Sequence, residues 1–160
     1  MNLSGRIHLS LELTATKADG LTTATDPLRE YLSRTLSSGA GANAANGLYH
    51  EEWSVAAEDT EQIDFTALTD RFGDALNFAR LKYLYILNTG TVPLYLTSTL
   101  VLLGAPVSAV PIRAGEFYIK GLQDATGYVV QNGISDTIIV ENLDPATAGT
   151  FDIVAVGATS

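Results

Sequence analysis

The chain has 160 residues, of which 46% are hydrophobic and 17% are charged. This balance is typical of one packed globular domain, here covering residues 1–160, and not of a disordered segment. Eighteen acidic and nine basic residues give a net charge of −9, and no segregated basic patch offsets it, which argues against a nucleic-acid partner. The sequence has no cysteine, which excludes disulfides, zinc–thiolate sites and thiol nucleophiles.

The composition along the chain also argues against a membrane partner. The first residues, "MNLSGRIHLSLEL", alternate polar with apolar side chains and lack the apolar core of a secretory signal. Residues 83–112 carry no charge, but five glycines and prolines interrupt any helix there. We therefore expect buried strands joined by turns in this stretch.

The N-terminal region predicts a strand followed by loops. Ile7, Leu9 and Leu11 alternate with polar residues, which is the period of a half-buried strand. The segment "KADGLTTATDP" (17–27) predicts a loop, because it is rich in Gly, Thr and Asp. Residues 28–36 fit either a helix or a strand, and we favour a strand. The small-residue segment "SSGAGANAANG" (37–47) predicts a flexible loop, so residues 1–46 form an N-terminal arm, or a strand plus a loop.

The stretch "TDRFGDALNFARLKYLYIL" (69–87) changes its period halfway. Its first half has helical spacing, but Gly73 inside a helix would cost about 1 kcal/mol relative to Ala. We therefore expect a short helical turn, or a loop, near residues 66–72 and a strand over 76–87. Strict alternation in that strand would place Arg80 and Lys82 on one face with Phe78, and Leu81, Tyr83 and other apolar residues on the opposite face.

Short strands separated by turn residues account for the remainder. The segments "EEWSVAA" and "EQIDF" come before the stretch described above, and six segments come after it: "PLYLTST", "LVLLG", "EFYIKGL", "GYVVQNG", "DTIIVEN" and "TFDIVAVGA". Strands at this spacing with turns between them predict an all-β fold, either a sandwich or a barrel.

No motif in the sequence predicts catalysis or a cofactor. "HEEW" at His50 lacks the second histidine of a zinc-protease helix, and His8 lies on the polar side of the first strand. "GISDT" lacks the closing glycine of a nucleophile elbow, and no glycine-rich phosphate loop occurs. Asp59, Glu61 and Asp64 are close enough in sequence to suit calcium, but they do not form a known calcium loop. We predict no catalytic, cofactor or metal residue.

Two groups of residues are candidates for partner contact. Arg71, Arg80 and Lys82 are three of only nine bases and fall close together, so we expect their face to contact a partner. Ile7, Leu9 and Leu11 form one side of a strand that can pair with a neighbour's sheet edge.

The order of several segments resembles small virion structural proteins of tailed bacteriophages. The resemblance rests on "LTDRFG" followed by "FARLKYLYILN", then "VPIRAGEFYI", "GYVV", "DTIIVEN" and "TFDIVAVG". The lead-in "GAGANAANGLYHEEWSVAA" is also similar, and the match extends roughly from Gly47 to Gly157. These are structural patterns and not catalytic signatures.

The resemblance implies an antiparallel β-sandwich, jelly-roll-like, in a non-enzymatic protein located in the virion after assembly in the bacterial cytoplasm. It implies a capsid decoration or cement protein that stabilises the phage head. The partners would be the major capsid protein or neighbouring virion proteins and further copies of the chain, as a trimer or dimer. The alternatives are a tail, neck or baseplate component, or a carbohydrate- or receptor-binding module on the same sandwich.

Overall fold

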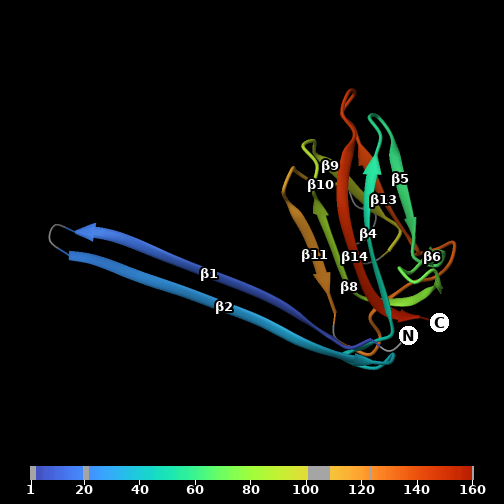
Figure 1. The fold of residues 1–160 in the computed structure, drawn as a ribbon, viewed down its shortest axis with the longest axis horizontal. Coiled ribbons are helices and arrows are strands. Elements are labelled where there is room, and N and C mark those ends of the chain that lie inside the picture. Colours follow the sequence, from blue (N-terminus) through green and yellow to red (C-terminus); the bar gives the residue numbers. More distant parts are fainter. Residues whose placement is uncertain (1–2, 20–21, 101–108, 123, 160) are drawn as a thin grey trace.

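A two-stranded arm projects from a β-sandwich in this computed structural model, which describes residues 3–19, 22–100, 109–122 and 124–159 (Figure 1). The described residues form strands, turns and loops, and none of them is helical. The strands are β1 (Gly5–Asp19), β2 (Thr22–Ser38), β3 (Ala44–Ala45), β4 (Gly47–Val55), β5 (Thr60–Asp64), β6 (Leu68–Thr69), β7 (Ala75–Leu76), β8 (Phe78–Asn88), β9 (Leu94–Ser98), β10 (Val110–Ile112), β11 (Phe117–Gly121), β12 (Tyr128–Val129), β13 (Thr137–Asn142) and β14 (Gly149–Thr159).

Eight of the described strands form the main part of the sandwich, in the connectivity of a jelly roll. One sheet has the order β11-β8-β14-β4, with the short β12 also paired to β8, and the other has the order β10-β9-β13-β5. Among these eight strands the first pairs with the last, β4 with β14, and the pairing continues inward as β5 with β13, β8 with β11, and β9 with β10, always antiparallel. This is the rolled-up hairpin of a jelly-roll domain, and it confirms the predicted fold class.

The core lies between the two sheets. Leu84 and Ile86 of β8 and Phe151 and Ile153 of β14 point inward and are at most 1% exposed. They pack with residues of the opposite sheet and its flanks: Ile63, Leu94, Leu96, Ile138 and Val140. Alternate residues of the same strands point outward, as period-two patterning requires.

Strand β8 departs from the alternation that we predicted. Its pairing with β14 shifts register between Val156 and Gly157 and again between Ala158 and Thr159. Each shift leaves one extra residue on β8, so Leu81 and Lys82 are both buried in succession. The prediction that Arg80 and Lys82 share one solvent- or interface-facing side with Phe78 is therefore wrong: Phe78 and Lys82 are each 1% exposed.

The predicted helical turn near residues 66–72 is absent from the described structure. Two turns stabilised by aspartates occupy the region instead. Asp64 accepts hydrogen bonds from the backbone N–H and hydroxyl of Thr66, at 2.8 and 2.7 Å. Asp70 accepts from the N–H groups of Phe72 and Asp74, at 2.9 and 3.0 Å. These side-chain bonds satisfy the backbone without a helix.

The arm replaces the loop predicted at residues 17–27. Residues 17–27 belong to β1 and β2 apart from the connection at 20–21, so the loop prediction there is wrong; backbone pairing runs from Gly5↔Leu36 to Asp19↔Thr22. Ser37 and Gly39 donate backbone hydrogen bonds to Asn43 and Ala45, at 3.0 and 3.2 Å, which ties the 37–47 loop together. Strand β10 falls in a segment predicted as a connection, and most of "LVLLG" lies outside the described residues.

Candidate interaction surface on the arm and the sandwich

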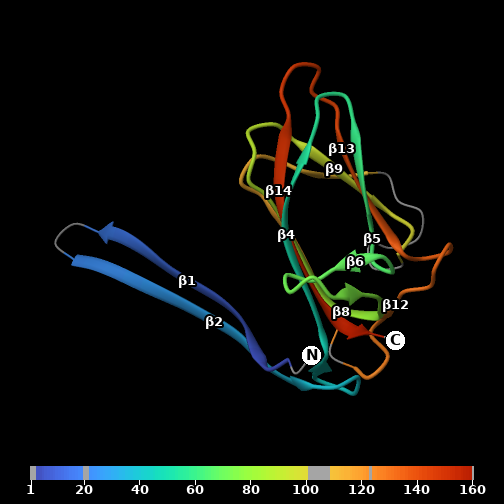
Figure 2. The ribbon, with the colours of Figure 1, turned by 45° about the vertical axis from the view of Figure 1, so that its right-hand side comes forward.

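The arm and the sandwich differ sharply in charge. Residues 1–38, which contain the arm, carry four basic and four acidic residues and are neutral. Residues 39–160 carry five basic and fourteen acidic residues, so the whole net charge of −9 belongs to the sandwich and its loops. Figure 1 and Figure 2 show the arm leaving the lower end of the sandwich and diverging from it along its length.

One side of the arm is lined with leucines. Antiparallel register places Leu9 opposite Leu32 and Leu13 opposite Leu28. We call this side the leucine face; its apolar members are Ile7, Leu9, Leu11, Leu13, Leu28 and Leu32, and Glu30 and Arg34 share it. Exposure rises outward, from half-buried Ile7 and Leu9 to 48% for Leu11 and 54% for Leu13. The outer leucines are therefore large apolar side chains in water.

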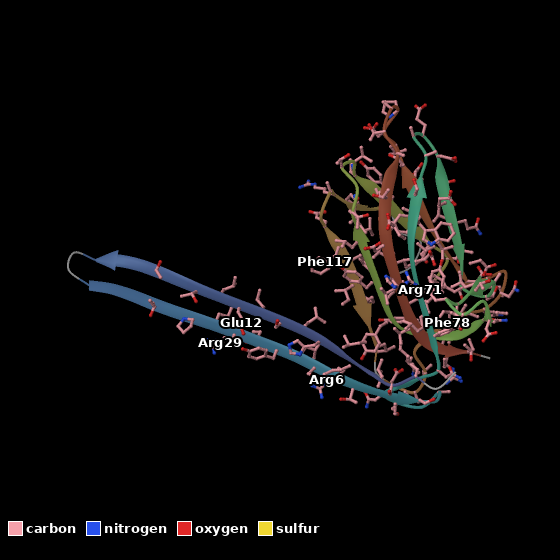
Figure 3. The ribbon with its side chains drawn as sticks, in the orientation of Figure 1. Arg6, Glu12, Arg29, Arg71, Phe78 and Phe117 are labelled. Carbon is pink, nitrogen blue, oxygen red and sulfur yellow. The ribbon has the colours of Figure 1, made fainter. Side chains whose placement is uncertain are left out.

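The opposite side of the arm is polar and internally bonded. The Tyr31 hydroxyl donates a 2.7 Å hydrogen bond to the Glu12 carboxylate, and this bond raises the pKa of Tyr31. The His8 and Tyr31 rings lie 6.3 Å apart. Figure 3 shows Arg6, Glu12 and Arg29 along the arm. This side is polar enough to face water. The exposed leucine side chains of the arm therefore lie on the leucine face.

The leucine face meets the sandwich at the base of the arm. There Leu36 and Ala45 pack on Val156, with Ile7 and Tyr83 against them. The Asn46 N–H donates to the Gly157 carbonyl at 3.0 Å, and the Thr159 N–H donates to the Asn46 side chain at 2.8 Å. The base is thus anchored through both apolar contact and backbone hydrogen bonds.

The sheet β11-β8-β14-β4 presents an apolar surface toward the arm. Cross-strand pairs align Tyr83 with Val156, Tyr85 with Val154 and Ile119, and Leu87 with Phe117. We call this surface the outer face; its apolar members are Leu48, Tyr83, Tyr85, Leu87, Phe117, Ile119, Val154 and Val156. Phe117 is 58% exposed and stands on the side of the sandwich nearer the arm (Figure 3). Its ring lies 6.0 Å from that of Tyr85.

A cleft separates the leucine face from the outer face. Near the base it has a volume of about 530 Å³ and is lined by Ile7 and Leu9 on one wall and by Tyr85, Phe117 and Val154 on the other. A second hollow of about 470 Å³ continues outward between Phe117 and the arm residues Leu11 and Leu32. The two apolar surfaces therefore belong to one opening cleft.

The predicted basic face is not formed. Arg71 is exposed near β4, at one edge of its sheet, and its Nε donates to the His50 carbonyl at 3.3 Å. Arg80 donates to the Ala125 carbonyl at 2.9 Å, and the Lys82 ammonium donates to the Asp124 carbonyl, both in the loop before β12. Burial lowers the pKa of Lys82. The structure thus places Arg80 and Lys82 together but away from Arg71; whether any of them contacts a partner stays a prediction.

The remaining candidate sites of the sequence do not converge. Within the described residues, no three His, Asp or Glu side chains gather in a geometry that would hold a metal, so Asp59, Glu61 and Asp64 form no such group. His8 lies on the polar side of the arm and His50 on β4. No helix among the described residues has the length and hydrophobicity to cross a membrane.

Comparisons with known proteins add little to this picture. No family profile matches the chain, and no curated protein matches it. The chain is similar to a solved structure entitled "Crystal structure of PirA", with a TM-score of 0.40 and 16% identity over 68% of this chain and 93% of that one. A likeness at this level carries no functional argument.

The structure adds residues to the predicted partner-contact set. Ile7, Leu9 and Leu11 do lie on one side of a strand, but their alternation does not reveal Leu28 and Leu32 as neighbours, because that placement depends on the hairpin register. Phe117 is a further exposed aromatic residue that no sequence pattern indicated. The spacing of Leu28, Leu32 and Leu36 fits a helix as well as a strand, so the strand that we favoured for residues 28–36 was correct but had no assigned pairing partner.

Proposed function

We propose that this chain is a non-enzymatic structural protein of a virion, in which it decorates or cements the head of a tailed bacteriophage. The observation that carries the proposal is the neutral, leucine-faced arm projecting from an acidic jelly roll. A cement protein holds many neighbours through buried surface and needs no reactive group, and an exposed apolar arm serves such contacts. The resemblance to small phage virion proteins points to the same role.

The acidic sandwich is consistent with this role. Its fourteen acidic residues keep it soluble and repel the nucleic acid inside a head. The neutral arm carries no such repulsion toward another protein. Decoration of a symmetric shell repeats one contact many times, so modest affinity per contact gives strong overall attachment.

The copy number of this chain per purified particle tests the proposal. Quantitative mass spectrometry against the major capsid protein is expected to give a ratio set by the lattice sites of the shell. A few copies per particle would favour the alternative, a tail, neck or baseplate component. Absence of the chain from particles would refute a virion role.

A carbohydrate- or receptor-binding role is the second candidate, and the exposed Phe117–Tyr85 ring pair is the observation that favours it. Exposed aromatic rings stack on sugars, but a sugar site also needs convergent polar groups. The apolar cross-strand neighbours of these rings, Leu87, Ile119 and Val154, offer none. A glycan array probed with the intact chain, and with Phe117→Ala as the matched variant, separates the two roles.

A further inference from the structure

We propose that the cleft receives a second copy of this chain: the outer leucines of one copy's arm pack on the outer face of another copy. The donated surface is Leu11, Leu13, Leu28 and Leu32, and the receiving surface centres on Tyr85 and Phe117. The inference deepens the proposed function by naming a partner and its contact surface.

The chain already makes this contact within itself at the base of the arm. Ile7 of the leucine face packs with Tyr83, Val154 and Val156 of the outer face. Farther out the arm diverges from the sandwich (Figure 1), and Leu11, Leu13 and Phe117 are exposed to water. The arm of a second copy would extend the same kind of apolar packing across the part of the outer face that the chain's own arm leaves uncovered.

The exposed leucines give a reason for association. Leu11, Leu13, Leu28 and Leu32 are between 42% and 54% exposed, and an isolated two-stranded hairpin is only marginally stable in water. Burying these side chains removes apolar surface from water and supports the arm. Phe117, at 58% exposed, gains in the same way on the receiving copy.

Charge favours the arm as the element that approaches. Two sandwiches that each carry the full charge of −9 repel one another, whereas the arm is neutral and meets an acidic sandwich without that repulsion. Arm-to-sandwich contact also keeps the sandwiches apart. A contact between two outer faces would instead bring the two acidic sandwiches together.

The available area indicates a contact of modest strength. From Leu28 to Leu32 the second strand of the arm has five residues. At about 3.3 Å per residue and roughly 10 Å for the width of two strands, this part of the leucine face covers about 165 Å². If each copy donates one arm and receives one, an exchanged pair buries about 660 Å² in total, below the roughly 1,200 Å² of a standard stable interface, so association is expected to depend on concentration.

The mass of the intact chain in solution is the first test. Light scattering over a range of concentrations is expected to give at least twice the mass of one chain. The variant Leu13→Asp/Leu32→Asp is expected to lose association and return to the mass of a single chain. Its matched control, Thr14→Asp/Ser33→Asp, adds the same charge at neighbouring exposed positions on the opposite side of the arm and is expected to keep the wild-type mass.

Cross-linking tests which surfaces meet. The natural chain has no cysteine, so Leu13→Cys and Phe117→Cys place single thiols on the donated and receiving surfaces. A mixture of these two variants with different tags, treated with a short bis-maleimide, is expected to give cross-linked pairs of unlike tags. Replacing Leu13→Cys by Thr14→Cys is expected to abolish most of this product.

Several results would overturn the inference. In light scattering, these are a wild-type chain that keeps the mass of one copy at every concentration, or equal masses for the two aspartate variants. In cross-linking, the contrary result is that the Leu13→Cys variant forms pairs only with itself. Efficient cross-linking within one chain carrying both cysteines would show that the arm closes on its own sandwich. The particle copy number is a separate measurement, so an oligomeric chain absent from particles would refute the virion role and leave this contact standing.

Discussion

At the scale of single residues, two features explain particular side chains of the sandwich: close approach of backbones, which requires glycine, and buried backbone groups, which require an amide partner. Gly157 lies where β14 shifts register against β8, and a Cβ there would stand 2.1 Å from the Arg80 carbonyl oxygen. Two amides, Asn88 and Asn142, are buried and hold several loops through their side chains. These positions support the sheet that carries the outer face.

Gly157→Ala is expected to destabilise the chain by about 1–3 kcal/mol, because the new methyl group forces β14 away from β8. The comparison is Gly41→Ala, where nothing lies within 4 Å of the added Cβ. Chemical denaturation of both variants measures the free energy of unfolding. Equal stability of the two would show that the register shift adjusts without cost.

Asn88→Leu is expected to cost about 2–4 kcal/mol, because it removes the buried amide that serves two backbone carbonyls; the Gly90 N–H keeps its second partner, the Thr150 carbonyl, at 3.0 Å. The Asn88 amide donates to the Val92 and Ile112 carbonyls, both at 2.8 Å, and its oxygen accepts from the Gly90 N–H at 3.0 Å. Asn77→Leu, at an exposed position, is the matched control. A loss no greater than that of the control, measured by urea denaturation, would contradict this role.

The stability of the folded chain is expected to depend on pH through Asp144, in the loop between β13 and β14. Hydrogen bonds from the Ala146 and Thr147 N–H groups lower the pKa of Asp144 below 3.8. A lowered carboxyl pKa stabilises the folded chain above the unfolded pKa, and this contribution is lost as the pH falls through the folded pKa. The melting-temperature difference between the wild type and Asp144→Ala is therefore expected to be constant above about pH 3.8 and to narrow below it. A constant difference at all pH values would mean that ionisation is irrelevant.

At the scale of elements, the arm is a separate unit attached at its base. Its strands pair with each other from Gly5↔Leu36 outward, and β2 pairs with β3 at Ser37 and Ser38. Apolar packing of the arm on the sandwich is concentrated near Ile7 and Leu36. The outer arm therefore adds surface without supporting the core.

Shortening the arm is expected to leave the sandwich stable. Joining Glu12 to Arg29 through an Asn-Gly turn keeps their register and removes the tip. The melting temperature is expected to stay within about 2 °C of the wild type, because the described side chains removed are all exposed. A much larger fall would show that the outer arm is part of the cooperative fold; the mass in solution of the same variant shows whether the tip is needed for association.

At the scale of the whole molecule, the separation of charge and apolar surface shapes association. The sandwich carries the net charge and the arm carries the exposed leucines. Like-charged sandwiches repel over about 30 Å at 0.01 M salt and about 8 Å at 0.15 M. The jelly-roll fold itself is shared by proteins of many functions, so the arm and its charge balance carry the functional argument.

Self-association is therefore expected to strengthen as salt rises from low to physiological concentration. Screening reduces repulsion between the acidic sandwiches and leaves the apolar contact of the arm unchanged. Sedimentation equilibrium at both salt concentrations measures the effect, with Leu13→Asp/Leu32→Asp as the variant that lacks the apolar contact and is expected to keep the mass of a single chain at both. Weaker association at higher salt would indicate that ion pairs dominate the contact.

Local patterns were enough to predict the all-β class and most of the sandwich strands, because alternation and turn residues act over a few neighbours. Only the tertiary structure placed Leu28 and Leu32 beside Leu9 and Leu13, since hairpin register depends on residues far apart in the chain. The burial of Lys82 was also decided by the tertiary structure. A register shift of one residue between β8 and β14 reverses the face of the sheet to which the following side chains point. The order of strands in the sheet places Arg71 and Arg80 apart, and the position of the arm beside the sandwich forms the cleft. Neither arrangement can be read from a local sequence pattern.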